Sequence, residues 1–221
     1  MAPIKVRPAS ADVAIADAIA AHTGRQPERA AEVLTWGADE HLLGALAGAW
    51  WIYCRNKDPG RRLASDHILL TTIVASALPH LLKMMFDQER PDRTTVRGHW
   101  RGIPFSGKRL DSFPSGHAVH IGALASAASV LPAKQRSLVW GVGAALVLTR
   151  IVLLAHWASD VAAGLAVGAV TERLLRHLTG YGIRSKTDGA KTPELLRKSV
   201  WHWRMPNPDL HSHRGASGGS A

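Results

Sequence analysis

Five apolar runs occupy the middle of this 221-residue chain, and none of them is a clean transmembrane segment of twenty residues. They cover residues 42–54, 68–86, 118–133, 138–158 and 161–171. Several fall short of the ~18 apolar residues that indicate a membrane-crossing helix. Lys83, Arg150 and His156 interrupt two of the longer runs. Together the runs predict an all-α fold, a bundle of about five helices.

Two features favour a membrane environment for this bundle. Trp50, Trp51, Trp140 and Trp157 lie at the ends of runs, where interfacial anchors are found. Small residues are dense in the last three runs, which suits close helix packing in lipid; they include Gly122, Ala123, Ala125, Gly141, Gly143, Gly164 and Gly168. We therefore expect five transmembrane helices, and a soluble helical bundle is the alternative.

The expected organisation has three parts. Residues 1–40 have no long apolar core and hence no convincing secretory signal, and the helical spacing of residues 10–38 predicts a segment that lies along the membrane interface. Residues 41–179 would form the membrane-embedded bundle. Residues 180–221 read as a polar basic tail that is partly disordered, with a short helix near 193–203.

Charge and cysteine content limit the other possibilities. The formal net charge is +10, but the basic residues are spread along loops and tail, and no nucleic-acid motif is present. Anionic lipid headgroups are the simpler partner for this charge. Cys54 is the only cysteine, so no intrachain disulfide forms. The sequence leaves the oligomeric state open.

Three polar clusters stand out against the apolar runs, and the first contains Lys83, Arg90 and Pro91. Lysine offers a compact charge, and arginine offers a planar fork that matches phosphate oxygens. On a continuing helix Lys83 and Arg90 would share one face, although Pro91 favours a helix end near Arg90. A pair of snorkelling surface cations is the alternative interpretation.

The second cluster is Pro114-Ser115-Gly116-His117, directly before an apolar run. Ser115 is a candidate N-cap, and Gly116 allows a ligand to approach the backbone closely. The free N–H groups of a helix N-terminus attract anions, and His117 in the first turn would reach such an anion as a proton donor. The alternative is an ordinary turn with a surface histidine.

The third cluster runs from Thr149-Arg150 to His156 and Asp160. On a helix, the four-residue spacing would place His156 and Asp160 face to face, so that the carboxylate orients the imidazole. Arg150 lies in an otherwise apolar stretch, where a charge is costly and usually functional. A buried Arg–Asp ion pair without chemistry is the alternative. Taken together, the clusters supply the positioning and charge neutralisation that phosphoryl transfer needs.

In order and spacing the clusters resemble the signature of the type 2 phosphatidic acid phosphatase superfamily. This group includes membrane lipid phosphate phosphatases, soluble acid phosphatases and vanadium haloperoxidases. Its signature reads Lys, six residues, Arg-Pro; then Pro-Ser-Gly-His; then Ser-Arg, five residues, His, three residues, Asp. Every spacing matches between Lys83 and Asp160, and the one departure is Thr149 in place of serine.

The resemblance implies a role for each matched residue. His156 would be the nucleophile that forms a phosphohistidine, Asp160 would orient and polarise it, and His117 would protonate the leaving oxygen and later help to activate water. The phosphate would be held by Lys83, Arg90, Ser115, the Gly116 backbone N–H and Arg150. This chemistry needs no metal and no other cofactor.

Helix parity gives an expectation for topology. If the five runs cross a membrane alternately, all three clusters meet at one face. The opposite face would carry Arg55, Lys57, Arg61, Arg62, Lys134 and Arg136, and the positive-inside rule makes that face cytoplasmic. We therefore expect a bacterial inner-membrane protein whose active site faces the periplasm.

The sequence thus predicts a membrane phosphatase that acts on a lipid phosphomonoester or diphosphate. Phosphatidic acid, phosphatidylglycerol phosphate, a polyprenyl diphosphate and lipid A phosphate all fit the clusters. The expected partners are the lipid phosphate and the bilayer, with no nucleic acid. The alternatives are a vanadate-dependent haloperoxidase and a catalytically silent membrane protein that binds lipid phosphate.

Overall fold

The described chain is mostly helical, as the apolar runs predict, and it comprises residues 3–91 and 110–182 of the computed structural model. All of these residues belong to one unit, Met1–Ile183. In chain order the elements are β1 (Ile4–Lys5), α1 (Ser10–His22), α2 (Arg25–Leu34), the 3-10 helix η1 (Thr35–Ala38), α3 (Glu40–Cys54), α4 (Pro59–Lys83), β2 (Phe86–Asp87), α6 (Gly116–Ala127), the 3-10 helix η2 (Ala128–Val130), α7 (Ala133–Val152) and α8 (Ala158–Thr179).

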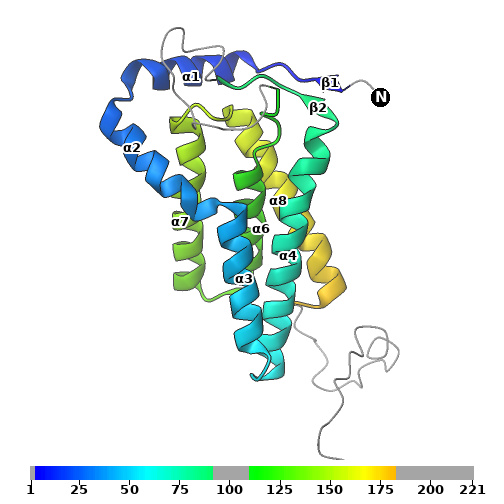
Figure 1. Cartoon of the computed structure of the whole chain (residues 1–221). Coiled ribbons are helices and arrows are strands. Elements are labelled where there is room, and N and C mark those ends of the chain that lie inside the picture. Colours follow the sequence, from blue (N-terminus) through cyan, green and yellow to red (C-terminus); the bar gives the residue numbers. More distant parts are fainter. Residues whose placement is uncertain (1–2, 92–109, 183–221) are drawn as a thin grey trace, which may run out of the picture. The chain divides into compact units, whose positions relative to one another are not determined.

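Helices α3, α4, α6, α7 and α8 form a bundle in which successive helices run in alternating directions (Figure 1). α6 packs against α4, α7 and α8. Because the directions alternate, the C-terminal ends of α4 and α7 lie at the same end of the bundle as the N-terminal ends of α6 and α8. Residues that are far apart in the sequence therefore meet at that end.

Glycines allow α6 and α8 to pack with their backbones in close contact. A Cβ atom at Gly168 would lie 2.0 Å from the carbonyl oxygen of Val119, and one at Gly122 would lie 2.2 Å from the carbonyl oxygen of Leu165. Real Cβ atoms do not approach other atoms so closely, so only glycine fits these positions. The density of small residues in the sequence therefore corresponds to one tight helix pair.

The N-terminal segment packs on the end of the bundle where α8 begins. The carboxylate of Asp12 in α1 accepts hydrogen bonds from the backbone N–H and the hydroxyl of Ser159, at 2.9 and 2.7 Å. Ala16 of the same helix packs against Leu154 and Trp157. β1 also pairs with β2 in a short parallel ladder that the sequence analysis did not anticipate. These contacts attach residues 3–22 to the bundle.

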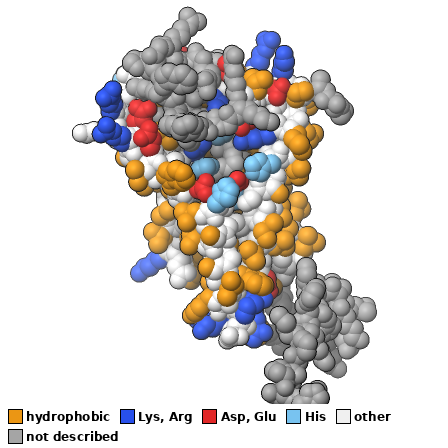
Figure 2. Space-filling view, in the orientation of Figure 1, with side chains coloured by type: hydrophobic (Ala, Val, Ile, Leu, Met, Phe, Trp, Pro, Cys, Tyr) orange, Lys and Arg blue, Asp and Glu red, His pale blue; other side chains and the backbone are white. Residues whose placement is uncertain are grey.

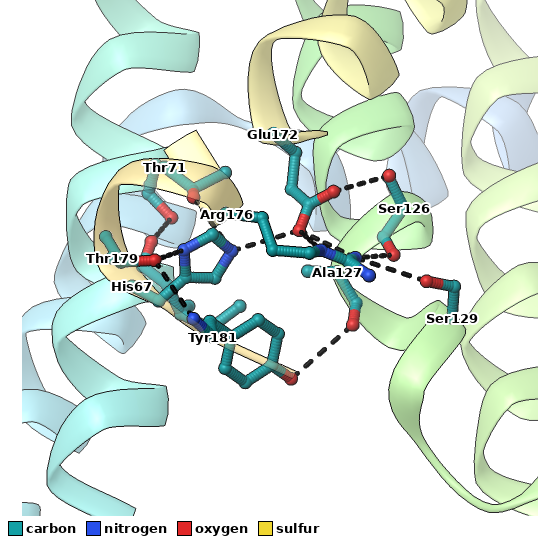
Figure 3. Close-up of polar contacts among 11 residues, drawn as sticks. His67, Thr71, Ser126, Ala127, Ser129, Glu172, Arg176, Thr179 and Tyr181 are labelled. Carbon is teal, nitrogen blue, oxygen red and sulfur yellow. Dashed lines mark hydrogen bonds and ion pairs between the residues drawn. The ribbon is translucent and has the colours of Figure 1, made fainter. Parts of the chain in front are cut away.

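A buried polar network connects α4, α6 and α8 toward the other end of the bundle (Figure 3). His67 Nε2 lies 3.0 Å from a carboxylate oxygen of Glu172, and both side chains are fully buried. Glu172 also accepts hydrogen bonds from Ser126 and Arg176. Because its charged groups are paired and hydrogen-bonded, this network braces three helices without an uncompensated buried charge.

The helix ends differ from the ends of the apolar runs. α4 begins nine residues before its run, because Asp58 accepts a hydrogen bond from the Arg61 N–H and Pro59 suits the first helical position. α8 continues to Thr179 and stops at Gly180, which has a left-handed φ of 76°. The helix predicted near 193–203, and nearly all of the predicted tail, lie outside the described residues. Within the part of the chain that the structure describes, no single helix has both the length and the apolar character needed to cross a bilayer.

Candidate active site

The three sequence clusters come together at the end of the bundle where α8 begins. Lys83 is the last residue of α4, His117 lies in the first turn of α6, and Asp160 lies in the first turn of α8. Arg150 is two residues before the end of α7. His156 lies in the loop between α7 and α8, outside both helices.

The loop that carries His156 folds back onto α7. Leu154 is buried and has a positive φ of 53°, an uncommon conformation for a residue with a branched side chain. The backbone N–H groups of Ala155 and His156 both donate to the carbonyl of Arg150, at 3.0 and 3.3 Å. Backbone strain of this kind is typical of functional sites, and here it sets the position of His156.

His156 and Asp160 do not share a helix as expected, because α8 begins only after His156, but their side chains still lie within ion-pair distance. Nδ1 of His156 donates to the backbone carbonyl of Ser112 at 2.7 Å, whereas Oδ2 of Asp160 lies 3.8 Å from Nδ1. A proton on Nδ1 leaves a lone pair on Nε2, which is the form that a nucleophile requires. The tautomer is therefore set by a carbonyl that the sequence analysis did not consider.

Asp160 is held in place by two hydrogen bonds to one of its oxygens. Oδ2 accepts from the hydroxyl of Ser112 at 2.5 Å and from the backbone N–H of Trp157 at 3.0 Å. Ser112 thus contacts both His156 and Asp160. His156 and Asp160 are therefore connected through this shared neighbour, and their side chains lie 3.8 Å apart.

Lys83 and Arg90 do not share a helix face, because α4 ends at Lys83 and the chain then enters β2. A carboxylate connects them instead. Oδ1 of Asp111 accepts from Nε and Nη2 of Arg90 at 3.1 and 2.9 Å, and its Oδ2 lies 3.7 Å from Nζ of Lys83. Nη1 of Arg90 donates to the carbonyl of Ala155, beside His156, at 3.0 Å.

Two buried donors of the candidate phosphate site have no partner among the described residues. They are Nε of Arg150 and the hydroxyl of Ser115. Arg150 also donates from Nη1 to the hydroxyl of Thr35 at 2.9 Å, which holds the guanidinium in place. Ser115 occupies the N-cap position of α6, as expected, but its side chain makes no capping hydrogen bond. Because buried polar groups normally find partners, both donors suit an oxyanion ligand.

Protein atoms around Gly116 do not exclude a Cβ atom, and the expected approach of a ligand to its backbone stays a prediction. A Cβ atom there would lie 3.7 Å from Cβ of Pro79, an ordinary contact distance. The described structure therefore has room for a side chain at this position. Any requirement for glycine would come from a bound ligand rather than from the protein.

Both histidines of the site are neutral when no ligand is bound. Burial, together with the charges of Arg90, Arg150 and Lys83, holds the pKa of His156 well below its usual value. Burial and the charge of Arg150 lower the pKa of His117 to about 3. A neutral imidazole suits a nucleophile, whereas a proton donor needs a bound anion to raise its pKa again.

Burial raises the pKa of Asp160 to about 6, although hydrogen bonds from Ser112 and Trp157 oppose this shift. The carboxyl group is therefore ionised in the unliganded protein only above about pH 6. Because kcat/KM reports ionisations of the free enzyme, we expect it to fall as the pH drops below 6. An Asp160→Asn variant should be slow at every pH and should lack this acidic limb. Phosphate release measured from pH 4.5 to 8 checks both expectations.

The raised pKa of Asp160 also predicts that the stability of the protein changes with pH. The folded-state pKa lies above the unfolded value of 3.8, so the folded protein binds the proton more tightly. Asp160 therefore contributes about 3 kcal/mol to the free energy of unfolding when it is protonated in the folded state. This contribution is fully present below pH 3.8 and is lost as the pH rises to 6. The melting temperature of Asp160→Asn should therefore rise relative to wild type between pH 4 and pH 7. A difference that stays constant over this range would contradict the assignment.

No group of three His, Cys, Asp or Glu side chains within residues 3–91 and 110–182 is arranged to hold a metal ion. The polar groups that converge on the candidate site are instead three cations and two imidazoles, with Asp111 and Asp160 beside them. This donor set suits an anion rather than a cation. The expectation of metal-independent chemistry stays a prediction.

Comparison with known protein families identifies the family of this chain. The model of the PAP2 superfamily matches residues 67–184, which is more than half of the chain. The chain belongs to the PAP2 superfamily. The resemblance read from the three clusters is therefore confirmed.

Two curated proteins resemble part of this PAP2 chain. It is 36% identical over 104 residues to the lipid A 1-phosphatase of Rhizobium johnstonii, a match that covers 47% of this chain and 43% of the relative. It is 40% identical over 102 residues to the lipid A 1-phosphatase of Rhizobium etli, covering 45% of this chain and 44% of the relative. The matched stretch thus spans less than half of the length of these relatives.

A solved structure shares the fold of this PAP2 chain. It is described as the first transmembrane PAP2-type phosphatidylglycerolphosphate phosphatase, from Bacillus subtilis, and it aligns with a TM-score of 0.55. The alignment covers 80% of this chain and 88% of that protein, at 20% sequence identity. At this identity the likeness supports the fold alone.

Sequence reasoning missed three residues that contact the predicted site: Thr35, Asp111 and Ser112. Asp111 and Ser112 lie three and two residues before Pro114, so their proximity to the second cluster was an available signal. Thr35 carried no signal, because it lies 115 residues from Arg150 in the sequence. It also lies outside the stretch that matches the superfamily.

Proposed function

We propose that this PAP2 protein removes phosphate from a lipid phosphomonoester or diphosphate through a phosphohistidine intermediate. The observation that carries the proposal is the environment of His156. Its Nδ1 proton is held by the Ser112 carbonyl, and three cations act on it from Lys83, Arg90 and Arg150. A nucleophile surrounded by permanent cations matches the needs of phosphoryl transfer.

In the proposed reaction Nε2 of His156 attacks the phosphorus while the bond between phosphorus and the lipid oxygen breaks. The imidazole gains positive charge in this step, and the ionised carboxylate of Asp160 stabilises that charge. Lys83, Arg90, Arg150 and the hydroxyl of Ser115 bind the phosphoryl oxygens. Water then attacks the phosphohistidine, which releases phosphate and restores the neutral histidine.

His117 is the proposed proton donor to the leaving oxygen. The unliganded imidazole is neutral, and its ring is hydrogen-bonded to the backbone of Thr35. Binding of an anionic phosphate beside it raises its pKa, so that the ring takes up a second proton. That proton passes to the lipid oxygen as the bond breaks, and the neutral ring then accepts a proton from the attacking water.

The surface of the bundle supports a location in the membrane. Large apolar side chains stay exposed along its helices, and Figure 2 shows them spread over one face. They include Leu46, Ile52 and Tyr53 of α3, Leu70 and Ile73 of α4, Leu138, Val142 and Leu148 of α7, and Val170 and Leu174 of α8. An exposed apolar surface of this extent is typical of contact with lipid.

We propose that the apolar stretches of these four helices and of α6 form five membrane segments, and that α1 and α2 lie at the interface. His117 and Asp160 come directly before the apolar stretches of α6 and α8, and His156 lies in the loop before α8. The reacting groups would therefore lie outside the membrane segments, at the end of the bundle where a headgroup phosphate can reach them.

The proposed orientation places the candidate site at the periplasmic face of a bacterial inner membrane. It rests on Arg55, Arg61, Arg62, Lys134 and Arg136, which belong to the ends of helices remote from the site. The positive-inside rule would keep that end in the cytoplasm. The names of the two Rhizobium proteins support lipid A as one substrate to test, and the name of the Bacillus phosphatase adds phosphatidylglycerol phosphate.

The proposal is tested by phosphate release from a panel of lipid phosphates, using the full chain in detergent with excess EDTA. The panel contains lipid A, phosphatidic acid, phosphatidylglycerol phosphate and a polyprenyl diphosphate. We expect metal-independent release from at least one of them. Release that EDTA abolishes would contradict the mechanism. Halide oxidation that requires vanadate and peroxide, without phosphate release, would favour the haloperoxidase alternative.

Membrane location is tested by fractionation. We expect the protein to pellet with membranes, to resist extraction by high salt and to dissolve in detergent. Protein that stays in the supernatant without detergent would contradict the five-segment proposal. A cysteine-accessibility assay on residues beside Arg61 and Arg136 would then establish which face is cytoplasmic.

A further inference from the structure

Asp111 is a carboxylate that lies among the cations of the candidate site, in addition to Asp160. It contacts both members of the first cluster, through Oδ1 to Arg90 and through Oδ2 to Lys83. The side chain of Arg90 is only 5% exposed and that of Asp111 is 20% exposed, so this is no solvated surface pair. None of the three phosphate-site motifs includes Asp111.

The backbone around Asp111 fixes this arrangement. The N–H of Gln88 donates to the carbonyl of Leu110 at 3.0 Å, and the N–H of Ser112 donates to the carbonyl of Gln88 at 3.1 Å. Residues 110–112 therefore lie alongside the segment that leads to Arg90. The same short segment presents Asp111 to the cations and Ser112 to His156 and Asp160.

Asp111 changes what Arg90 offers to a ligand. A guanidinium has five N–H groups. Two of them donate to Asp111 and one donates to the carbonyl of Ala155. Among the described residues, one N–H on each terminal nitrogen is left for a ligand, and both can donate to phosphate oxygens.

Asp111 also changes the charge of the site. Among the described residues, Lys83, Arg90 and Arg150 contribute three positive charges, and Asp111 and the ionised Asp160 contribute two negative charges. A less positive site disfavours the ligand that carries the larger negative charge. A terminal diphosphate carries more negative charge than a phosphomonoester, so the charge of Asp111 disfavours the diphosphate more strongly.

We propose that Asp111 is a specificity-determining residue that lowers the positive charge of the site and so disfavours a diphosphate relative to a phosphomonoester. This inference rests on the proposed phosphatase function and narrows its substrate class. Asp111 sets the net charge and the orientation of Arg90, and it takes no part in bond breaking.

The test compares wild type with Asp111→Asn, because asparagine keeps a side-chain oxygen for Arg90 and carries no charge. The probes are inorganic orthophosphate and pyrophosphate, used as competitive inhibitors of one phosphomonoester substrate at pH 8 and constant ionic strength with EDTA. We expect the ratio of the pyrophosphate to the orthophosphate inhibition constant to fall about tenfold, the size of effect that one neighbouring charge has on a buried ionisation.

Three further variants serve as controls for the effect of charge on this ratio. Asp17→Asn makes the same charge change on the exposed face of α1 and should leave the ratio unchanged. Lys83→Gln removes a positive charge and should raise the ratio, which keeps the idea testable if Asp111→Asn fails to fold. The double variant Lys83→Gln with Asp111→Asn should return the ratio to the wild-type value.

A merely structural role for Asp111 would weaken both inhibitors by the same factor and leave their ratio unchanged, and that result would overturn the proposal. If the wild type releases no phosphate from any lipid, the phosphatase function fails separately. Binding of orthophosphate and pyrophosphate measured by calorimetry then still tests Asp111, because the ratio of the two dissociation constants depends on charge rather than on turnover.

Discussion

Replacing His156 with alanine is expected to lower kcat for lipid phosphate hydrolysis by about 10⁴-fold to 10⁶-fold, the range seen when a nucleophile is removed. The reason is that Nε2 of His156 would form the bond to phosphorus, and a methyl group offers no substitute. A moderate loss of stability should accompany the change, because His156 is buried and its hydrogen bond to the Ser112 carbonyl is lost. Initial rates of phosphate release and a melting curve in the same detergent measure both effects.

Two other histidine variants show whether the loss is specific. His177→Ala alters an exposed histidine in the last turn of α8, remote from the site, and should retain full activity. His117→Ala should be slow with lipid substrates but much less impaired with p-nitrophenyl phosphate, whose leaving group needs no proton.

Acid-labile, base-stable labelling from a phosphate-labelled substrate should appear in wild type and vanish in His156→Ala. Turnover that survives in His156→Ala would refute the role of His156 as the nucleophile.

The second large effect is expected at Gly168. An alanine there would bring its Cβ atom to 2.0 Å from the carbonyl oxygen of Val119 and 2.8 Å from the backbone nitrogen of Ala123. Both obstacles are backbone atoms, so α6 and α8 have to move apart. We expect Gly168→Ala to lower the free energy of unfolding by about 3 kcal/mol, at the upper end of overpacking costs.

Activity should fall with stability in this variant, because the α6–α8 contact also positions the site. The backbone N–H of Ser115, before α6, donates to the carbonyl of Asp160 in α8 at 3.3 Å. Gly141→Ala in α7 is the matched control, since nothing lies within 4 Å of a Cβ atom there. That variant should be more stable than wild type by about 1 kcal/mol, because alanine favours helix. Equal melting temperatures for the two variants would show that the helices are not in close contact.

The helical bundle was predictable because hydrophobic periodicity and small residues are local properties of the sequence. The five apolar runs correspond to α3, α4, α6, α7 and α8. Their ends were less predictable, because capping groups such as Asp58 and Gly180 extend or stop a helix independently of its apolar content. The pairing of β1 with β2 was not predictable, since two-residue strands carry no periodic signal.

The residues of the candidate site were predictable from the sequence, but the contacts between them were not. The residue types and their order indicated the superfamily, and the structure brings these residues to one end of the bundle. The helical argument for His156 with Asp160 failed because Leu154 turns the chain before α8 begins. The argument for Lys83 with Arg90 failed because α4 stops between them. Local spacing predicts a shared face only where a helix is continuous.

By itself the sequence determined the family, the helical fold class and the residue types at the candidate site, because these depend on order and spacing along the chain. Only the tertiary structure decided which groups touch: Ser112 on His156, Asp111 on Lys83 and Arg90, and Thr35 on Arg150. These contacts join segments that are separated by up to 115 residues. Their existence depends on how close α6 and α8 approach and where each loop turns, and no local pattern encodes either quantity.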